Sequence, residues 1–561
     1  MEGIETMPYA VTLLLFVLPG ALAALLHCRL KEHQKAVTRL IVFVCYSAVI
    51  SGVLIGFKWI RGASIATIFQ WFAAPLSFGF YLAAACAMAA LLPLFYVLVT
   101  EKRIAVRGWN SAKPAKSNVE TWNWKRFLQI LRRIAIVLVA GIVIGAILVT
   151  AVYALPLGNI QQNVLQSAKT VESEGSYPFL YSNWRSMRLD NFTDSIMLLM
   201  AAYPEDRGLI QDAMLSTYTR YADCDPAEGL VKWSTGEQAG IETHSYSRYW
   251  HGYLVWLKPL LEIMEYRQIR ILNTVLQILL VLAVTGAMFR KGYKRLILPF
   301  LIMYLFLTPV ALFQSFQFSW IFYVMAVSSL VLLLRFESMQ KRRSFYLLFL
   351  VTGMATSYVD FLTYPLITLG VPLVIYLVLR NRRTMWRGVA DVVAMALVWG
   401  IGYVGMWAGK WLLCTLLTDS NVLLSVGENL TARMSFTYVE AALDYAEENF
   451  NVIDIIKRNI EAYNQWLYMG PFLLSFFGYA LFYGRERLCV HSRILVVNTT
   501  WLSASLIPLL LVALSPFAWF FVASNHTYIH YWYAHRTLAV SAFAALAVFA
   551  RPLPGLCTNR D

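Results

Sequence analysis

IAIVLVAGIVIGAILVTAVYAL, residues 134–155, is the stretch of sequence that decides the fold. It contains no charged side chain, and the basic segment FLQILRR (127–133) precedes it directly. A helix needs about 20 apolar residues to cross the hydrocarbon core of a bilayer, which is about 30 Å thick. The stretch therefore predicts a transmembrane helix that begins beside a basic segment.

Apolar runs of this kind recur along the whole chain of 561 residues. Hydrophobic residues make up 59% of the chain and charged residues 14%, whereas an ordinary soluble domain has about 45–50% and about 25%. These proportions exclude a soluble globular enzyme and a disordered chain. We expect an all-α, polytopic membrane protein of about thirteen transmembrane helices. Besides 134–155, the predicted spans are 9–27, 39–57, 76–99, 270–289, 296–313, 316–334, 344–359, 362–379, 391–409, 467–483, 494–514 and 537–550.

Basic side chains are concentrated in alternate loops between these runs. Cytoplasmic loops of membrane proteins hold an excess of Lys and Arg, so we place the basic loops in the cytoplasm, the N-terminus outside and the C-terminus inside. The same bias explains the net charge of +15 without a nucleic-acid partner. We expect a multi-pass protein of a bacterial cell membrane. The basic loops read CRLKEHQK, EKRIAVR through FLQILRR, FRKGYKR, KRRS, RNRRTMWR and RERLCVHSR.

Two of the predicted outer loops, 156–269 and 410–466, are too long to be simple connections, and loops of such length usually carry function. Apolar residues recur at helical spacing within 204–223 and 437–468. This pattern predicts helices that either lie on the membrane surface or pack as a soluble cap. The predicted domains are a three-helix membrane bundle (1–100), a basic cytoplasmic linker (101–133), a membrane body that includes both outer loops (134–550) and a cytoplasmic tail (551–561).

Acidic residues stand at two places on the predicted outer face. Asp190 and Asp194, in the sequence RLDNFTD, are four residues apart and share a face if the segment is helical. Either carboxylate could act as a general base with Arg188 nearby, although Asp190 could equally serve only to cap the helix that follows. Asp360 falls in the outer turn between two spans, beside Tyr358. Ionisable residues at such depth are typically functional, and the alternative is a simple turn residue.

Cationic side chains stand on the same face, in two aromatic stretches. Arginine and histidine suit a phosphate or pyrophosphate group, although Trp, Tyr and Arg also serve as plain anchors at the membrane interface. The scattered cysteines and acids form no recognisable metal-ligand set, so we expect no certain cofactor, and a divalent metal is left open. The first stretch, HSYSRYWHGYLVWLK (244–258), contains Arg248, Tyr249, His251 and Lys258, and the second, SNHTYIHYWYAHR (524–536), contains His526, His530 and Arg536.

This layout resembles the GT-C superfamily of membrane glycosyltransferases, which use polyprenyl-phosphate sugars. In that family a span is followed at once by a large outer loop that opens on an acidic motif. Here 134–155 and 156–269 correspond to these two parts, with RLDNFTD in the place of the motif. The likeness covers roughly 130–550 by layout. The motif itself is neither DxD nor a DD or ED pair, and additional predicted spans precede it.

The resemblance implies the transfer of a sugar, with inversion, from a polyprenyl-phosphate donor in the membrane to a glycan or lipid acceptor on the outer face. It implies Asp190, Asp194 or Asp360 as the catalytic carboxylate. The donor phosphate would be bound by Arg248, His251, His526, His530 and Arg536, and the substrates also by Arg188, Tyr249, Tyr358 and Lys258.

Two other classes fit the same residues. A transporter or flippase of a lipid-linked sugar or anionic glycan would use outer cations and aromatic residues, but it should also carry charges along both halves of the membrane path. The predicted spans, such as LILPFLIMYLFLTP, are nearly free of charge, which favours an enzyme. A glycan polymerase or ligase has its large loop late in the chain, whereas the larger loop here is early.

Overall fold

The computed structural model describes residues 124–550 apart from 182–183, 205, 383, most of 421–447 and most of 485–505. The predicted spans 9–27, 39–57 and 76–99, most of the predicted linker and the predicted tail lie outside the described residues. The chain divides into two compact units. The larger comprises Lys116–Ala462 and Ser503–Pro552, and the smaller comprises Met1–Ala115, Tyr463–Leu502 and Leu553–Asp561.

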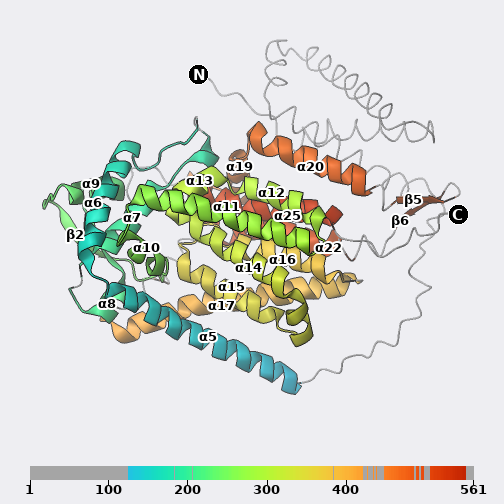
Figure 1. The fold of residues 1–561 in the computed structure, drawn as a ribbon, viewed down its shortest axis with the longest axis horizontal. Coiled ribbons are helices and arrows are strands. Elements are labelled where there is room, and N and C mark those ends of the chain that lie inside the picture. The colour runs from blue at the N-terminus through green and yellow to red at the C-terminus, as the bar shows by residue number, and fades with distance from the viewer. Residues whose placement is uncertain are drawn as a thin grey trace, which may run out of the picture. The chain divides into compact units, whose positions relative to one another are not determined.

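Helices make up nearly all of the larger unit (Figure 1), which confirms the expected helical class. Five helices in the described part of the chain are long and apolar enough to span a membrane, and the count of about thirteen stays a prediction. The five are α5 (Trp124–Tyr153), α11 (Tyr266–Arg290), α14 (Phe316–Arg342), α17 (Met385–Leu417) and the run Tyr531–Ala550, which comprises α24 (Tyr531–Ala534), η5 (His535–Leu538) and α25 (Ala539–Ala550). Shorter apolar helices are α15 (Phe345–Val359), α16 (Leu366–Arg380) and α22 (Ile507–Val522).

The segment between α5 and α11 folds as a cap (residues 156–265) at one end of these helices, at the left in Figure 1. Its apolar side chains share one core with the end of α5, through Val149, Tyr153 and Leu198 among others. Because α7 is buried along most of its length, a packed cap describes this segment better than separate surface helices do. The cap contains α6 (Leu157–Glu174), η1 (Arg185–Met187), α7 (Asn191–Ala202), α8 (Leu209–Leu215), α9 (Pro226–Ser234), α10 (Leu254–Leu261) and the antiparallel strands β1 (Thr217–Tyr221) and β2 (Ile241–Ser245).

The helical prediction for 204–223 is wrong in its second half. α8 ends at Ser216, which has a left-handed φ of 51°, and β1 then pairs with β2. The sequence TYTRY alternates threonine and aromatic residues, which favour strands. The side chains therefore select the extended conformation once a partner strand is present.

The predicted helix over 437–468 is confirmed for α19 (Val452–Glu461). Asn451 begins this helix with a capping box, in which its side chain accepts from the backbone of Asp454 and Asp454 accepts in return from the backbone of Asn451. Just before it, β3 (Thr437–Tyr438) and β4 (Glu448–Asn449) form a short antiparallel pair. α19 thus has a start fixed by its own sequence.

The predicted span 296–313 is interrupted. After η2 (Lys294–Leu296), α12 (Ile297–Phe306) is separated from α13 (Pro309–Gln314) by Thr308, whose φ is 56°. Proline has no backbone N–H and disfavours a helical conformation in the residue before it. Pro309 therefore accounts for the break.

The predicted span 494–514 also differs. Its first residues form β6 (Ile494–Val497), which pairs with β5 (Leu488–His491), and α22 begins only at Ile507 with Pro508 in its first turn. β5, β6 and α20 (Trp466–Gly484) are the described elements of the smaller unit. α20 agrees with the predicted span 467–483.

Two glycines bring the backbones of α15 and α17 into contact. A Cβ atom on Gly353 would overlap the carbonyl oxygen of Trp399, and one on Gly402 would overlap the carbonyl oxygen of Leu350. Small residues are what allow two helices to approach so closely. We call this contact the α15–α17 seam.

Candidate functional site

Two of the predicted stretches, RLDNFTD (188–194) and SNHTYIHYWYAHR (524–536), lie together in the larger unit. The guanidinium carbon of Arg188 lies 4.2 Å from the ring centre of Tyr177 and 4.8 Å from that of Trp532, so the group contacts both rings, which meet each other edge-to-face. The indole N–H of Trp532 also faces the carboxylate of Asp190 and lowers its pKa. We call Tyr177, Arg188, Asp190 and Trp532 the Trp532 cluster.

Asp190 is a buried carboxyl group with an unusual pKa. It is the N-cap of α7, and its Oδ1 accepts from the backbone N–H of Thr193 at 3.0 Å, as the capping alternative expected. Burial raises its pKa from 3.8 to about 6, and the neighbouring Asp194 raises it too, while the hydrogen bond from Thr193 and the nearby indole of Trp532 oppose the shift. A carboxyl group with this pKa exchanges protons near neutral pH.

Asp194 belongs to a different set of contacts. Its carboxylate accepts from the hydroxyl of Tyr266 at 2.5 Å and from the backbone N–H groups of Phe316 and Gln317 at 2.9 Å each. These bonds attach α7 to α11 and cap the N-terminus of α14. Both carboxylate oxygens are therefore committed to holding three helices together.

The contacts of Asp194 extend into a buried ionic network. Arg270 donates to both carboxylate oxygens of Glu174, at 2.7 and 3.0 Å, to the side-chain oxygen of Asn191 at 3.0 Å and to the hydroxyl of Tyr266 at 2.9 Å. We call Glu174, Asn191, Asp194, Tyr266 and Arg270 the Tyr266 network. It joins α6, α7 and α11 through charged groups that satisfy one another.

Asp360 follows α15 directly, in the turn that leads to α16, as predicted. It accepts from the backbone N–H of Thr363 at 3.0 Å, and burial raises its pKa to about 6. Tyr358, its predicted neighbour, donates its hydroxyl to the carbonyl of Gly145 at 2.8 Å. The geometry of Asp360 is that of a turn-stabilising residue, and Tyr358 packs α15 against α5.

In the stretch 244–258, the predicted phosphate ligand His251 is engaged by its own chain. His251 is buried, its Nε2 donates to the carbonyl of Tyr246 at 2.7 Å, and its Nδ1 lies 3.1 Å from the hydroxyl of Tyr253. Burial lowers its pKa to about 3. A neutral imidazole with both nitrogens bonded to its own chain is a poor phosphate ligand, which corrects the expectation for His251.

The other predicted residues of this stretch contact aromatic rings. The Nζ atom of Lys258 is buried over the ring of Tyr153 at 4.6 Å, and the guanidinium carbon of Arg248 lies 5.5 Å from the ring centre of Tyr246. Tyr249 packs against Phe361, with ring centres 5.6 Å apart. These contacts join the cap to α5 and to the turn after α15.

Arg536 is fully buried and serves the packing of the chain. Its Nε donates to the carbonyl of Leu307 and the hydroxyl of Thr308, both at 3.0 Å, and its Nη groups donate to the carbonyls of Trp532 and Ser186. The side chain therefore does not extend to lipid headgroups. It holds the Trp532 turn and η1 against the break at Thr308, which makes it a positioning residue rather than the expected phosphate clamp.

The two histidines of the last stretch lie against each other, with ring centres 4.7 Å apart. His526 is buried, and its Nε2 donates to the carbonyl of Leu362 at 2.6 Å. His530 stacks on Tyr533 and meets Trp532 edge-on, with ring centres 5.1 Å apart. His526 thus connects α23 (Ser524–Ile529) to the turn of Asp360, and His530 borders the Trp532 cluster.

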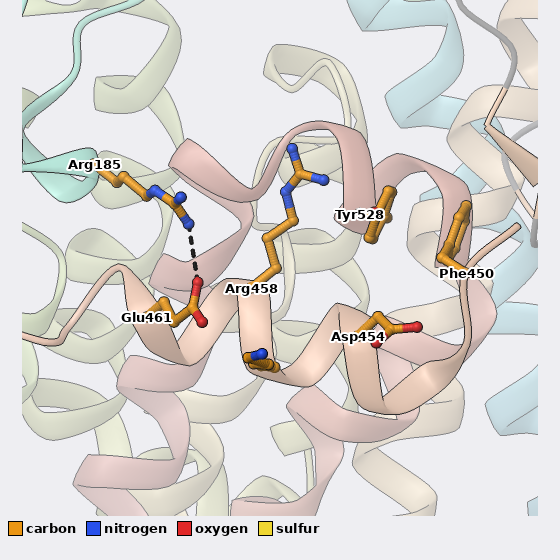
Figure 2. Close-up of a pocket in the computed structure, with 7 residues that line it drawn as sticks. Arg185, Phe450, Asp454, Arg458, Glu461 and Tyr528 are labelled. Atoms are coloured by element: carbon orange, nitrogen blue, oxygen red, sulfur yellow. Dashed lines mark hydrogen bonds and ion pairs between the residues drawn. The ribbon is translucent and has the colours of Figure 1, made fainter. Parts of the chain in front are cut away.

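A cavity of about 350 Å³ lies between η1, α19 and α23 (Figure 2). We call it the α19 pocket, and its lining residues are Arg185, Phe450, Asp454, Lys457, Arg458, Glu461 and Tyr528. The guanidinium carbon of Arg458 lies 4.5 Å from the ring centre of Tyr528 and 4.3 Å from that of Tyr531. Because Tyr531 precedes Trp532, this pocket neighbours the Trp532 cluster along the chain.

Sequence reasoning missed the α19 pocket. The signal was present as the adjacent pair Lys457 and Arg458 on a helix with acidic residues, but such charges usually mark a solvated helix face. Arg458 differs from a charge on a solvated helix face only through its contacts with Tyr528 and Tyr531, and these two residues are distant from it in the sequence.

Neither a metal-binding group in the described residues nor a similar known protein indicates what this site does. Within the described residues, no group of three or more His, Cys, Asp or Glu side chains is placed to hold a metal ion. No family model matches the chain, and neither a curated protein nor a solved structure shows significant similarity to it.

Proposed function

We propose that the protein is a membrane glycosyltransferase that moves a sugar from a polyprenyl-phosphate donor to a glycan or lipid acceptor at the membrane face occupied by the cap. The observation that carries this proposal is Asp190, a buried carboxyl group with a pKa of about 6, in one cluster with the guanidinium of Arg188. A proton acceptor and a fixed cation are the two groups that such a transfer requires.

Asp190 and Arg188 have separate roles in the proposed reaction. The acceptor oxygen forms a bond to the anomeric carbon of the sugar while its proton passes to the carboxylate of Asp190. The bond between that carbon and the phosphate oxygen breaks, and its electron pair remains on the phosphate, beside Arg188. Attack from the opposite face inverts the anomeric configuration. Proton abstraction of this kind contributes about 10²–10⁴-fold to the rate.

The distribution of buried charge supports an enzyme over a transporter. In the described spans, the fully buried cations Arg270, Lys410 and Arg536 each lie near the end that contacts the cap. Their partners there include Glu174, the carbonyl of Met214 and the carbonyl of Ser186, respectively. A transport path would need charged groups farther along the spans, where the buried polar side chains, such as Gln277, Ser328 and Thr352, are uncharged.

The test is transfer of a labelled sugar from a panel of short-chain polyprenyl-phosphate sugars by the purified full-length protein. Asp190→Asn is expected to lower the rate at least about 10²-fold, with the wild-type rate rising with pH through about 6 as the carboxylate ionises. Glu228→Gln, an exposed change of the same kind in α9, is expected to leave the rate unchanged.

Two results would overturn the proposal. One is an Asp190→Asn variant that transfers sugar as fast as the wild type. The other is a protein that only moves the labelled lipid between leaflets of a vesicle without attaching its sugar to any acceptor, which would identify a transporter.

A further inference from the structure

Arg458 has hydrogen-bond donors that the chain does not use. Its guanidinium is held between the rings of Tyr528 and Tyr531, and no described residue accepts a hydrogen bond from it or pairs with it as an ion. In Figure 2 it rises from α19 between Arg185 on one side and Tyr528 on the other. The two ring contacts hold the group in place while its N–H donors stay without an acceptor among the described residues, and a guanidinium can bind an oxyanion through two such donors.

The other charges of the α19 pocket favour an anion as its occupant. Lys457 and Arg458 have no ion-pair partner among the described residues. The two acids are already engaged, because Glu461 pairs with Arg185 at 3.1 Å and Asp454 accepts from the backbone N–H of Asn451 at 2.9 Å. The lining thus holds three cations against two acids, and this excess of positive charge favours an anion in the cavity.

The surroundings of the pocket favour a lipid as the source of that anion. α19 exposes Ile453 (74%) and Ile460 (49%) on either side of Lys457, and Tyr181 (61%) is exposed close to Arg185 in the chain. Exposed isoleucines with a lysine between them are typical of a helix at a membrane surface, where apolar side chains enter the lipid and cations lie at headgroup level.

We propose that the α19 pocket binds the phosphate group of an anionic membrane lipid, with Arg458 as the principal donor and Lys457 and Arg185 as its flanking cations. The site goes beyond the proposed function and does not depend on it, since it would hold a lipid whether or not the chain transfers a sugar. Its place next to Tyr531 and Trp532 would anchor the turn that carries the Trp532 cluster.

The experiment is calorimetric titration of the full-length protein in a neutral detergent at low salt. The probes are dihexanoyl phosphatidic acid, dihexanoyl phosphatidylcholine and inorganic phosphate. Phosphatidic acid is expected to bind, the zwitterionic lipid to bind more weakly, and inorganic phosphate to bind more weakly as well because it lacks the apolar chains. Equal affinity for both lipids would overturn the proposal, and inorganic phosphate binding as tightly as phosphatidic acid would overturn the assignment to a lipid.

Variants locate the binding in the pocket. Arg458→Gln is expected to weaken phosphatidic acid binding by about tenfold or more, since hydrogen bonds to charged groups are worth about 1.5–3 kcal/mol. Arg267→Gln, an exposed arginine at the start of α11 outside the pocket, is the matched control and should bind as the wild type does. An unchanged affinity in Arg458→Gln would place the lipid elsewhere.

A gain of affinity separates this role from a folding defect. Glu461→Gln removes a negative charge from the pocket and releases Arg185 from its ion pair, so the variant is expected to bind phosphatidic acid more tightly than the wild type. A misfolded protein would not gain affinity. Weaker or unchanged binding in Glu461→Gln would contradict the proposal.

Discussion

The Tyr266 network and the Trp532 cluster meet at the first turn of α7, and each contains an aspartate and an arginine. The two regions differ in how far the chain itself uses the hydrogen-bonding groups of these side chains. In the Tyr266 network, Asp194 accepts from Tyr266 and from the N-terminus of α14, and Arg270 donates to Glu174. In the Trp532 cluster, Asp190 is bonded to Thr193 and faces one indole N–H, and Arg188 contacts two rings. Apart from the Nε of Arg270, the first region uses its donors and acceptors, whereas the second retains bonding capacity that includes the Nε of Arg188.

This difference teaches how to assign roles to buried charged residues. Burial alone does not distinguish a site from a structural network, because Asp190 and Asp194 are both buried. The distinction lies in whether the chain itself consumes the donors and acceptors. A side chain whose capacity is used up fixes the fold, whereas one with capacity left can act on a substrate.

The largest effect is expected from Asp194→Ala in the Tyr266 network. The change leaves three buried donors, from Tyr266, Phe316 and Gln317, without an acceptor. Breaking a buried charged contact of this kind costs about 3–5 kcal/mol, so the thermal midpoint in detergent should fall sharply or the folded yield should collapse. Asp206→Ala, an exposed change, is the control. Equal melting of Asp194→Ala and wild type would remove the distinction between the two regions.

The next effect concerns the pH dependence of stability and Asp190→Asn. The folded pKa of about 6 lies above the unfolded value of 3.8, so the folded state binds the proton more tightly. The Asp190 contribution is most favourable below pH 3.8 and is lost as pH rises through about 6, by up to about 3 kcal/mol at 1.36 kcal/mol per pKa unit. Asparagine keeps the cap without the charge.

Thermal midpoints of wild type and Asp190→Asn between pH 4 and 8 measure this contribution. The variant is expected to be the more stable of the two at pH 7, and the gap should close as pH falls towards 4. Two curves that stay parallel over this range would show that the carboxyl group of Asp190 is not held in the unusual state described above.

A smaller effect is expected from Arg188→Gln in the Trp532 cluster. If Arg188 binds the donor phosphate, its loss should raise the KM for the lipid-linked sugar by about tenfold, because a hydrogen bond to a charged group is worth about 1.5–3 kcal/mol. Steady-state kinetics with the labelled donor measure it, with Arg207→Gln in an exposed ion pair as the control. An unchanged KM would assign Arg188 to packing only.

The smallest effect is expected from Trp532→Phe. Phenylalanine keeps an aromatic face for Arg188 but removes the N–H that lowers the pKa of Asp190. The acid side of the rate profile should move to higher pH by up to about one unit, since a neutral hydrogen bond contributes about 0.5–1.5 kcal/mol. Trp256→Phe, a change at an exposed ring, should not move it. A profile shifted to lower pH would contradict the assigned contact.

Much of the fold could be predicted because it depends on local patterns. The apolar run before Tyr153 and the run after Phe316 are helices as expected. Predictions failed where a local pattern was ambiguous, as at Thr217–Tyr221, whose strand depends on a partner strand, or where proline interrupts an apolar run, as at Pro309.

The site could be predicted only in part. The sequence placed Asp190 and Arg188 only on the same outer face as the last aromatic stretch, and the structure brings Arg188 to within 4.8 Å of the ring centre of Trp532. The sequence could not predict which cations would bond to the chain itself and which would keep their donors available. Whether Arg536 bonds to backbone carbonyls or Arg458 contacts two tyrosines is decided by contacts between distant segments, which leave no periodic trace in the sequence.

The α15–α17 seam has a mechanical consequence. With no side chain between Gly353 and the backbone of Trp399, or between Gly402 and the backbone of Leu350, the two helices can neither roll over nor slide past each other without collision. Under the lateral pressure of a bilayer, α15 and α17 would therefore move together as one rigid unit. Even the methyl group of alanine at either position would force the two backbones apart, so descendants of this chain would be confined to glycine at both positions.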